Sequence, residues 1–230
     1  MTTRLQTVKE ELAITLGPLT LRGDLLVPEM ASGLVIFAHG SGSGRLSPRN
    51  QFVAEVIRRR NIGTLLFDLL TEEEESIDIQ TRHLRFDIPM LAERLIAVSK
   101  WTGAHEDTRH LRQGFFGAST GAGAALVAAA EIGVGIAAVV SRGGRPDLAG
   151  GALERVQAPV LLIIGENDEP VIAMNEEAYE KLHSEKEIKI VPGATHLFEE
   201  PGTLETAAHL AADWFERYLS AGNKAIGQRN

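Results

Sequence analysis

The stretch Gln113-Gly114-Phe115-Phe116-Gly117-Ala118-Ser119-Thr120-Gly121 is the part of this sequence that decides the fold. Its first four residues form a short, largely apolar run, which is typical of a strand covered on both faces. Residues 122–130, which follow the stretch, are small and favour a helix. In the second half, the pattern Gly117-x-Ser119-x-Gly121 indicates a sharp turn from strand to helix. The unit is therefore strand, tight turn and helix, which is the repeat of an α/β domain.

Similar patterns lie on both sides of this unit. Apolar runs occur at residues 34–38, 64–67, 136–140, 160–164 and 188–191, and helical patterns occur at 52–57, 86–98, 179–182 and 204–219. Two further strand-like runs, 12–16 and 19–21, flank Gly17-Pro18 and predict an antiparallel pair. We therefore expect an α/β fold with a mostly parallel eight-stranded sheet, an N-terminal antiparallel pair, and helices on both faces.

The chain is expected to form one domain over residues 1–230, in which the polar tail 221–230 frays. The connection 141–157 is too short for a large cap, so we expect an open cleft with residues 70–79 as a partial lid. The acidic run 72–75 is expected to be a solvated loop or the start of a helix. Trp214 and Phe215 are expected to face the sheet, and the sequence leaves the oligomeric state open.

Composition narrows the classes of function. The chain holds 23 Lys and Arg against 31 Asp and Glu, a formal net charge of −8, which argues against a nucleic acid as its main partner. The sequence contains no cysteine, which excludes disulfides, thiolate metal sites and a cysteine nucleophile. Residues 1–6 lack the pattern of a secretory signal, and no run is apolar enough to span a membrane. We expect a cytoplasmic protein that acts on small molecules, without membrane or nucleic-acid partners.

Polar side chains of complementary chemistry follow three of the predicted strands, and ligands bind beyond the carboxyl ends of strands in open α/β sheets. The three are Ser119, Asp168 and His196, in that order along the chain. A serine hydroxyl needs a base to become a nucleophile. We therefore expect His196 to take the proton of Ser119 and Asp168 to orient the imidazole. Glu166 and Glu169 compete with Asp168 for that role.

The sequence resembles the α/β-hydrolase superfamily and, within it, the dienelactone-hydrolase-like group. The resemblance runs from residue 12 to residue 219, and besides the elbow its characteristic stretches are HGSGSGRLSPRN (39–50), LLFDLLT (65–71), SRGGRPDL (141–148) and VPGATHLFEEPG (191–202). A bacterial subgroup with such stretches occurs alone or fused to phosphoribosyltransferase-type domains. The resemblance implies a serine hydrolase that cleaves an ester, thioester or lactone through an acyl-enzyme, without a cofactor.

Two positions depart from dienelactone hydrolase itself. That enzyme has a cysteine where this chain has Ser119, and its substrate-binding arginine, four residues after the histidine, is replaced here by Glu200. Dienelactone is therefore not the expected substrate. The superfamily pattern G-x-x-D, which begins here at Gly165, favours Asp168 over its acidic neighbours. The resemblance also gives His39 the structural role of shaping its loop by hydrogen bonding.

Two backbone N–H groups are expected to form the oxyanion hole. One belongs to Thr120, the residue after the nucleophile, and the resemblance gives the other to Ser41. Arg45 and Arg142 are candidate contacts for a carboxylate or phosphate on the substrate. In the alternative, these arginines only brace loops. Their acidic partners would then be Asp68, Asp147 or Glu199.

We expect neither a metal site nor a bound cofactor. His105 and His110 lie in a polar connection and lack the spacing of metal ligands. Nothing in the sequence indicates a flavin, nicotinamide or haem site. Two other functions stay open, because they require the same fold: a ligand-binding protein without catalysis, and an acyltransferase that uses the same triad.

Overall fold

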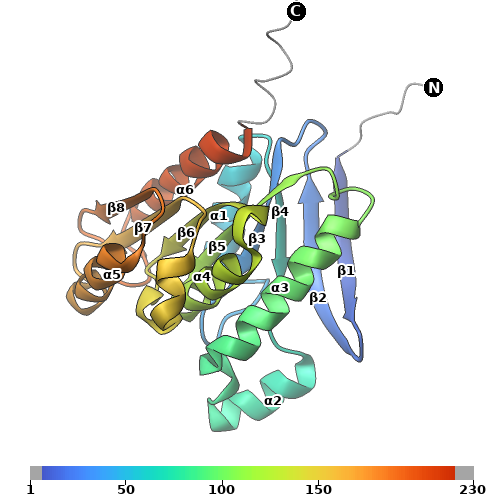
Figure 1. The fold of residues 1–230 in the computed structure, drawn as a ribbon, viewed down its shortest axis with the longest axis horizontal. Helices are drawn as coiled ribbons and strands as arrows, with labels where there is room; N and C mark the ends of the chain where they lie inside the picture. The colour runs from blue at the N-terminus through green and yellow to red at the C-terminus, as the bar shows by residue number, and fades with distance from the viewer. Residues whose placement is uncertain (1–6, 221–230) are drawn as a thin grey trace, which may run out of the picture.

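Eight strands form one sheet in the computed structural model, which describes residues 7–220 (Figure 1). The strands are β1 Val8–Leu16, β2 Leu19–Val27, β3 Gly33–Ala38, β4 Gly63–Phe67, β5 Arg112–Ala118, β6 Ile136–Arg142, β7 Val160–Gly165 and β8 Lys186–Val191. Their order across the sheet is β1-β2-β4-β3-β5-β6-β7-β8. The pairs β1–β2 and β2–β4 are antiparallel, and the other five are parallel, so the predicted sheet is confirmed. The tail 221–230 lies outside the described residues.

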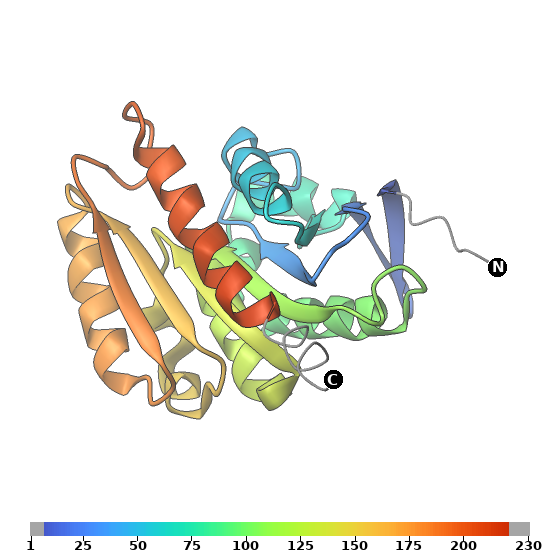
Figure 2. The ribbon, with the colours of Figure 1, turned by 90° about the horizontal axis from the view of Figure 1, so that it is seen from above.

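Helices cover both faces of the sheet, as predicted (Figures 1 and 2). Two helices pack together on one face, and three helices with a 3₁₀ segment cover the other. The first pair is α1 Pro48–Arg58 and α6 Thr203–Leu219. The second set is α3 Ile88–Ala104, α4 Thr120–Ile132, α5 Glu169–Lys181 and the 3₁₀ segment η3 Pro146–Arg155.

Each face of the sheet has its own apolar cluster. Phe37, Phe116 and Phe215 belong to the cluster under α1 and α6, whereas Phe115 belongs to the cluster on the other face. Consecutive strand residues point to opposite faces, so Phe115 and Phe116 serve both layers. Because both faces are covered at the centre of the sheet, strands β3 to β7 are almost entirely buried, whereas the outer strands β1, β2 and β8 also carry exposed polar residues. Trp214 and Phe215 are buried against this sheet, as expected.

The apolar residues that begin two of the predicted helical patterns, 52–57 and 86–98, are exposed instead of packed against the sheet. Phe52 on α1 is 38% exposed, and Phe86 is 54% exposed. Phe86 ends a separate 3₁₀ turn, Leu84–Phe86. The α3 helix starts only after it, because the Asp87 carboxylate accepts the Met90 N–H and caps the first turn.

The acidic run 72–75 begins a helix, α2 Glu72–Thr81, and so takes the second of its two expected forms. The Thr71 hydroxyl accepts the Glu74 N–H, and the Glu74 carboxylate accepts the Thr71 N–H. This reciprocal capping box satisfies two N–H groups that a helix start leaves unpaired. Four acids in the first turn also favour the positive end of the helix dipole.

The connection from β6 to β7 consists of η3 and short loops, so the predicted absence of a large cap is confirmed. Among the helices between residues 7 and 220, none is both long and apolar enough to cross a membrane.

Candidate active site

Ser119 stands on the tight turn between β5 and α4. Its φ of 50° and ψ of −123° lie where residues other than glycine are rarely found. The two flanking glycines are required because the turn leaves no room for a side chain at either position. A Cβ on Gly117 would lie 2.4 Å from the Ala122 Cα, and one on Gly121 would lie 2.2 Å from the Ala38 carbonyl oxygen. The predicted strand-to-helix turn is therefore present.

His196 and Asp168, which follow β8 and β7, are hydrogen-bonded to each other. The His196 Nδ1 lies 2.7 Å from the Asp168 Oδ2. The Asp168 side chain is 11% exposed and that of His196 is 38% exposed. The Glu166 carboxylate instead accepts the Gly193 N–H, and Glu169 is exposed. Of the three acids considered from the sequence, Asp168 is the one bonded to the imidazole.

The loop that carries His196 is fixed by Glu200. This carboxylate accepts the Thr195 hydroxyl at 2.6 Å and the Thr195 backbone N–H at 3.1 Å, and these bonds lower the pKa of Glu200. The loop also touches β7 directly, because a Cβ on Gly165 would lie 2.4 Å from the Ala194 carbonyl oxygen. Where dienelactone hydrolase has an arginine, this chain thus has a carboxylate that holds the histidine loop.

Ser119 and His196 line one pocket of about 210 Å³. The same pocket is also lined by Ser41, Arg49 and Arg142. Among the hydrogen bonds within residues 7–220, none joins the Ser119 hydroxyl to the imidazole. Such contacts are often long in free enzymes and tighten when substrate binds. The pocket therefore brings together the serine, the histidine and two arginines.

A larger cavity of about 640 Å³ lies alongside and shares four lining residues with this pocket. The beginning of α2 and the residues just before it line the larger cavity. No residue of 70–79 lines the pocket of Ser119. The segment expected to be a partial lid thus borders the neighbouring cavity.

The two residues expected to supply the oxyanion hole, Ser41 and Thr120, are hydrogen-bonded to each other. The Ser41 N–H donates to the Thr120 hydroxyl at 3.0 Å, and the two hydroxyl oxygens are also 3.0 Å apart. The Thr120 N–H is at the first position of α4, where backbone N–H groups have no partner within the helix. Before the Ser41 N–H can bind an oxyanion, it has to release the Thr120 hydroxyl.

Arg45 has the contacts of a residue that braces loops. Its guanidinium lies 3.2 Å from Asp68, 3.1 Å from Glu11 and 3.5 Å from Asp24, and its backbone N–H donates to Asp68 at 2.7 Å. These contacts favour the second of the two roles considered for Arg45, with two acids that the sequence did not suggest.

Arg142, at the end of β6, has none of these partners. The residue is 7% exposed, and its Nε and Nη1 are buried without a hydrogen bond. Its guanidinium carbon lies 6.0 Å from the ring centre of Phe116 and 5.7 Å from that of Phe198. Burial, together with the nearby Arg49, lowers the pKa of Arg142 to about 10.

His39 links two loops from a buried position. Its Nε2 accepts the Leu69 N–H at 2.9 Å, so the proton is on Nδ1, which lies 3.0 Å from the Gly40 carbonyl oxygen. Burial lowers the pKa of His39. The loop-shaping role expected for this residue agrees with these two hydrogen bonds.

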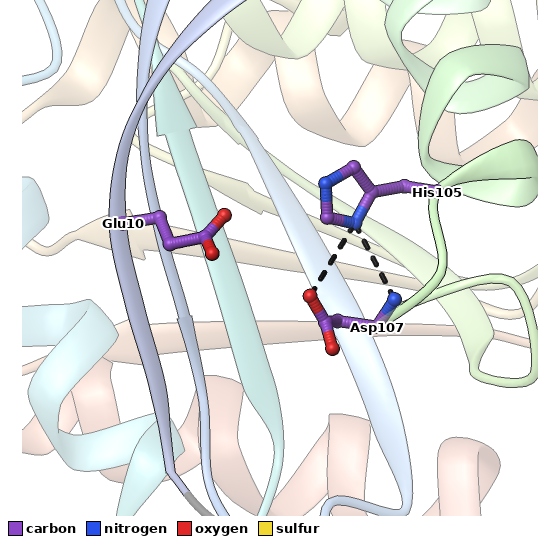
Figure 3. A group of neighbouring side chains, drawn as sticks. All are labelled: Glu10, His105 and Asp107. Atoms are coloured by element: carbon purple, nitrogen blue, oxygen red, sulfur yellow. Dashed lines mark hydrogen bonds and ion pairs between the residues drawn. The ribbon is translucent and has the colours of Figure 1, made fainter.

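One group of side chains far from Ser119 has metal-ligand chemistry. Ligand atoms of Glu10, His105 and Asp107 lie within 4.8 Å of one another (Figure 3). His105 follows α3 and Glu10 is on β1, so the group lies at the end of the parallel strands opposite to the serine. His110, the other histidine considered from the sequence, is not part of this group.

Two residues of the site were not singled out from the sequence. Arg49 lines the pocket and pairs with Glu199 at 3.1 Å. Gly143 has a φ of 51°, and a Cβ there would lie 3.1 Å from the His196 carbonyl oxygen. Gly143 directly follows β6, so the rule that ligands bind beyond strand ends could have identified it.

Comparison with known proteins identifies relatives over nearly the whole chain. The model of the dienelactone hydrolase family matches residues 58–222. A Mycobacterium tuberculosis protein, provisionally named a phosphoribosyl transferase, is 55% identical over 210 residues, which are 91% of this chain and 46% of that protein. The chain thus spans about half the length of this curated relative.

Solved structures show the same fold. The crystal structure of a dienelactone hydrolase from Anabaena variabilis has a TM-score of 0.91 at 56% identity, and the match covers 93% of this chain and 99% of the other. Est1E from Butyrivibrio proteoclasticus has a TM-score of 0.76 at 15% identity, with 91% and 99% covered. At that identity the second match shows the fold alone.

Proposed function

The chain belongs to the dienelactone hydrolase family, and from its site we propose that it is a serine hydrolase that cleaves an ester, thioester or lactone bond of a small substrate. The observation that carries this proposal is the 2.7 Å hydrogen bond between His196 and Asp168, with the imidazole lining the same pocket as the strained Ser119. An oriented imidazole beside a serine on a sharp turn is the arrangement that activates a hydroxyl.

The first half of the proposed reaction forms an acyl-enzyme. The Ser119 Oγ attacks the carbonyl carbon while its proton passes to the His196 Nε2. Asp168, which accepts the proton on Nδ1, stabilises the imidazolium. The oxyanion accepts the N–H of Thr120 and that of Ser41, which exchanges the Thr120 hydroxyl for it. His196 then protonates the leaving atom, the bond to it breaks, and the acyl group stays on Ser119.

The second half releases the acid. A water molecule gives a proton to His196 and attacks the acyl carbon, and His196 returns the proton to the Ser119 oxygen as the ester bond to the enzyme breaks. The pocket of about 210 Å³ favours small acyl groups. The same acyl-enzyme serves an acyltransferase if another acceptor replaces water.

The proposal is tested on Ser119→Ala with 4-nitrophenyl acetate and a fluorophosphonate probe. We expect kcat to fall by about 10³-fold or more, because the nucleophile is lost, and the probe to add to the unmodified chain but not to the variant. Ser76→Ala, on the exposed face of α2, is the matched control and keeps both reactions. Equal turnover in Ser119→Ala and the unmodified chain would contradict the proposal. Absence of both turnover and labelling would favour the binding protein.

A further inference from the structure

Arg142 is a buried cation next to the nucleophile turn. The Ser119 N–H donates to the Arg142 carbonyl oxygen at 3.3 Å, so the two residues are held side by side. Arg142 also lines the pocket that holds Ser119 and His196. The charge on Arg142 therefore lies beside that pocket, close to the second arginine of the lining, Arg49.

This charge has no counterion in the described part of the chain. Arg142 takes part in no salt bridge among residues 7–220, and two of its three guanidinium nitrogens are buried without a hydrogen bond. The rings of Phe116 and Phe198 offer only their faces. A buried charge is costly unless it is paired. Arg45, the other arginine considered from the sequence, shows the contrast, since three carboxylates surround it.

The charged side chains that line the pocket are positive, like Arg142 itself. The lining includes two arginines, four serines and an asparagine, and no Asp or Glu. The second arginine, Arg49, is partly exposed and pairs with Glu199, whose side chain is 64% exposed. An anion that enters this pocket meets a guanidinium and hydroxyl donors and is not repelled by a carboxylate on its walls.

We propose that the pocket beside Ser119 binds an anionic oxygen group of the substrate, a carboxylate or a phosphate, on the guanidinium of Arg142, with Arg49 as a second cation at the rim. The substrate would then be a small ester that carries a negative charge. That the substrate is an ester rests on the function proposed above, whereas the anion site rests on the two arginines and on the pocket that they line. Its position differs from that of the arginine in dienelactone hydrolase, because Glu200 stands there and is bonded to Thr195.

Direct binding tests the anion site without catalysis. Succinate, inorganic phosphate and neutral succinamide are titrated calorimetrically into Ser119→Ala, alone and combined with Arg142→Gln. We expect succinate or phosphate, but not succinamide, to bind, and Arg142→Gln to weaken that binding about tenfold or more, the effect of a lost hydrogen bond to a charged group. The preferred anion tells a carboxylate site from a phosphate site. Arg155→Gln, an exposed pair with Glu131, is the matched control.

Two further variants guard against misfolding of Arg142→Gln. Arg142→Lys keeps the charge but not the planar fork, and we expect it to restore part of the binding. Arg49→Gln changes a partly exposed residue and should weaken anion binding by a smaller factor. Equal affinity for succinate and succinamide, or anion binding that neither Arg142→Lys nor Arg49→Gln alters, overturns the proposal.

Kinetics separates failure of this inference from failure of the proposed function. The ratio of kcat/KM for mono-4-nitrophenyl succinate to that for 4-nitrophenyl butyrate is expected to fall about tenfold or more in Arg142→Gln. Cleavage of both esters through Ser119 with an unchanged ratio leaves the hydrolase and overturns the anion site. Anion binding that depends on Arg142, without cleavage of any ester, leaves the anion site and overturns the hydrolase.

Discussion

Gly121 shows how one missing Cβ shapes the site at the scale of a residue. An added Cβ would meet the Ala38 and His39 carbonyl oxygens at 2.2 and 2.5 Å, and backbone atoms cannot move aside as a side chain can. We predict that Gly121→Ala lowers the free energy of unfolding by about 3 kcal/mol or more and lowers turnover, as urea unfolding and ester hydrolysis would measure. Gly151→Ala, where an added Cβ meets open space, is the control and should change stability by about 0.5 kcal/mol or less.

Glu200 is a second position where one side chain matters. Hydrogen bonds from Thr195 lower the pKa of Glu200, so the folded state favours its carboxylate. The stabilisation is present above the ordinary carboxyl pKa of about 4.3 and is lost as pH falls below it. We predict that Glu200→Ala lowers the Tm at pH 7, and that this difference shrinks toward pH 3. Glu205→Ala, an exposed position on α6, is the control. A Tm difference that stays constant with pH would contradict the prediction.

At the scale of an element, α2 depends on its capping box. Thr71→Ala removes the hydroxyl that accepts the Glu74 N–H, which typically costs about 1 kcal/mol. We predict that this loss appears as faster hydrogen exchange over residues 72–81, the helix whose first turn is capped. The helix α3 should keep its protection, because the ion pair between Glu74 and Arg94 is not changed by the substitution. Ser76→Ala, in the middle of the same helix, should leave that exchange unchanged. Uniform exchange changes across the chain would count against a local effect.

The elements also differ in how far the sequence alone predicts them. The parallel strands were predictable because burial on both faces leaves continuous apolar runs, and Ser119 was predictable because its turn requires glycine on both sides. The exposure of Phe86 was not predictable, because its apolar side chain fits the period of α3, whereas the N-cap at Asp87 makes the helix start after Phe86. Periodicity reports which residues are apolar, but the cap decides where a helix starts.

At the scale of the whole molecule, contacts between residues far apart in the sequence decide which arginine is paired with carboxylates. The sequence places Arg45 and Arg142 alike, as cations that follow strands. Folding then brings β1, β2 and the end of β4 around Arg45, so that three carboxylates surround it, and brings two phenylalanine rings to Arg142. The order of elements follows from local patterns, whereas these partners depend on strand order across the sheet, which local patterns do not specify.

His39 joins the loops after β3 and β4 by hydrogen bonds, and its protonation is expected to make the stability of the whole fold depend on pH. Burial lowers the pKa of His39, an effect larger than the opposite ones from the Gly40 carbonyl, Asp68 and Glu75. A proton on Nε2 would also break the bond that accepts the Leu69 N–H. The unfolded chain therefore takes up a proton on His39 near pH 6.5, whereas the folded chain does not, so the contribution of His39 to stability is full above that pH and is lost as pH falls.

We predict that His39→Gln makes the free energy of unfolding less dependent on pH between 6.5 and 5, because glutamine can accept the Leu69 N–H but takes up no proton. The difference in slope is at most one proton, about 1.36 kcal/mol per pH unit. Urea unfolding at several pH values would measure it, with His209→Gln on the exposed face of α6 as the control. Parallel stability curves for the unmodified chain and His39→Gln would show that the buried imidazole takes up its proton without opening the two loops.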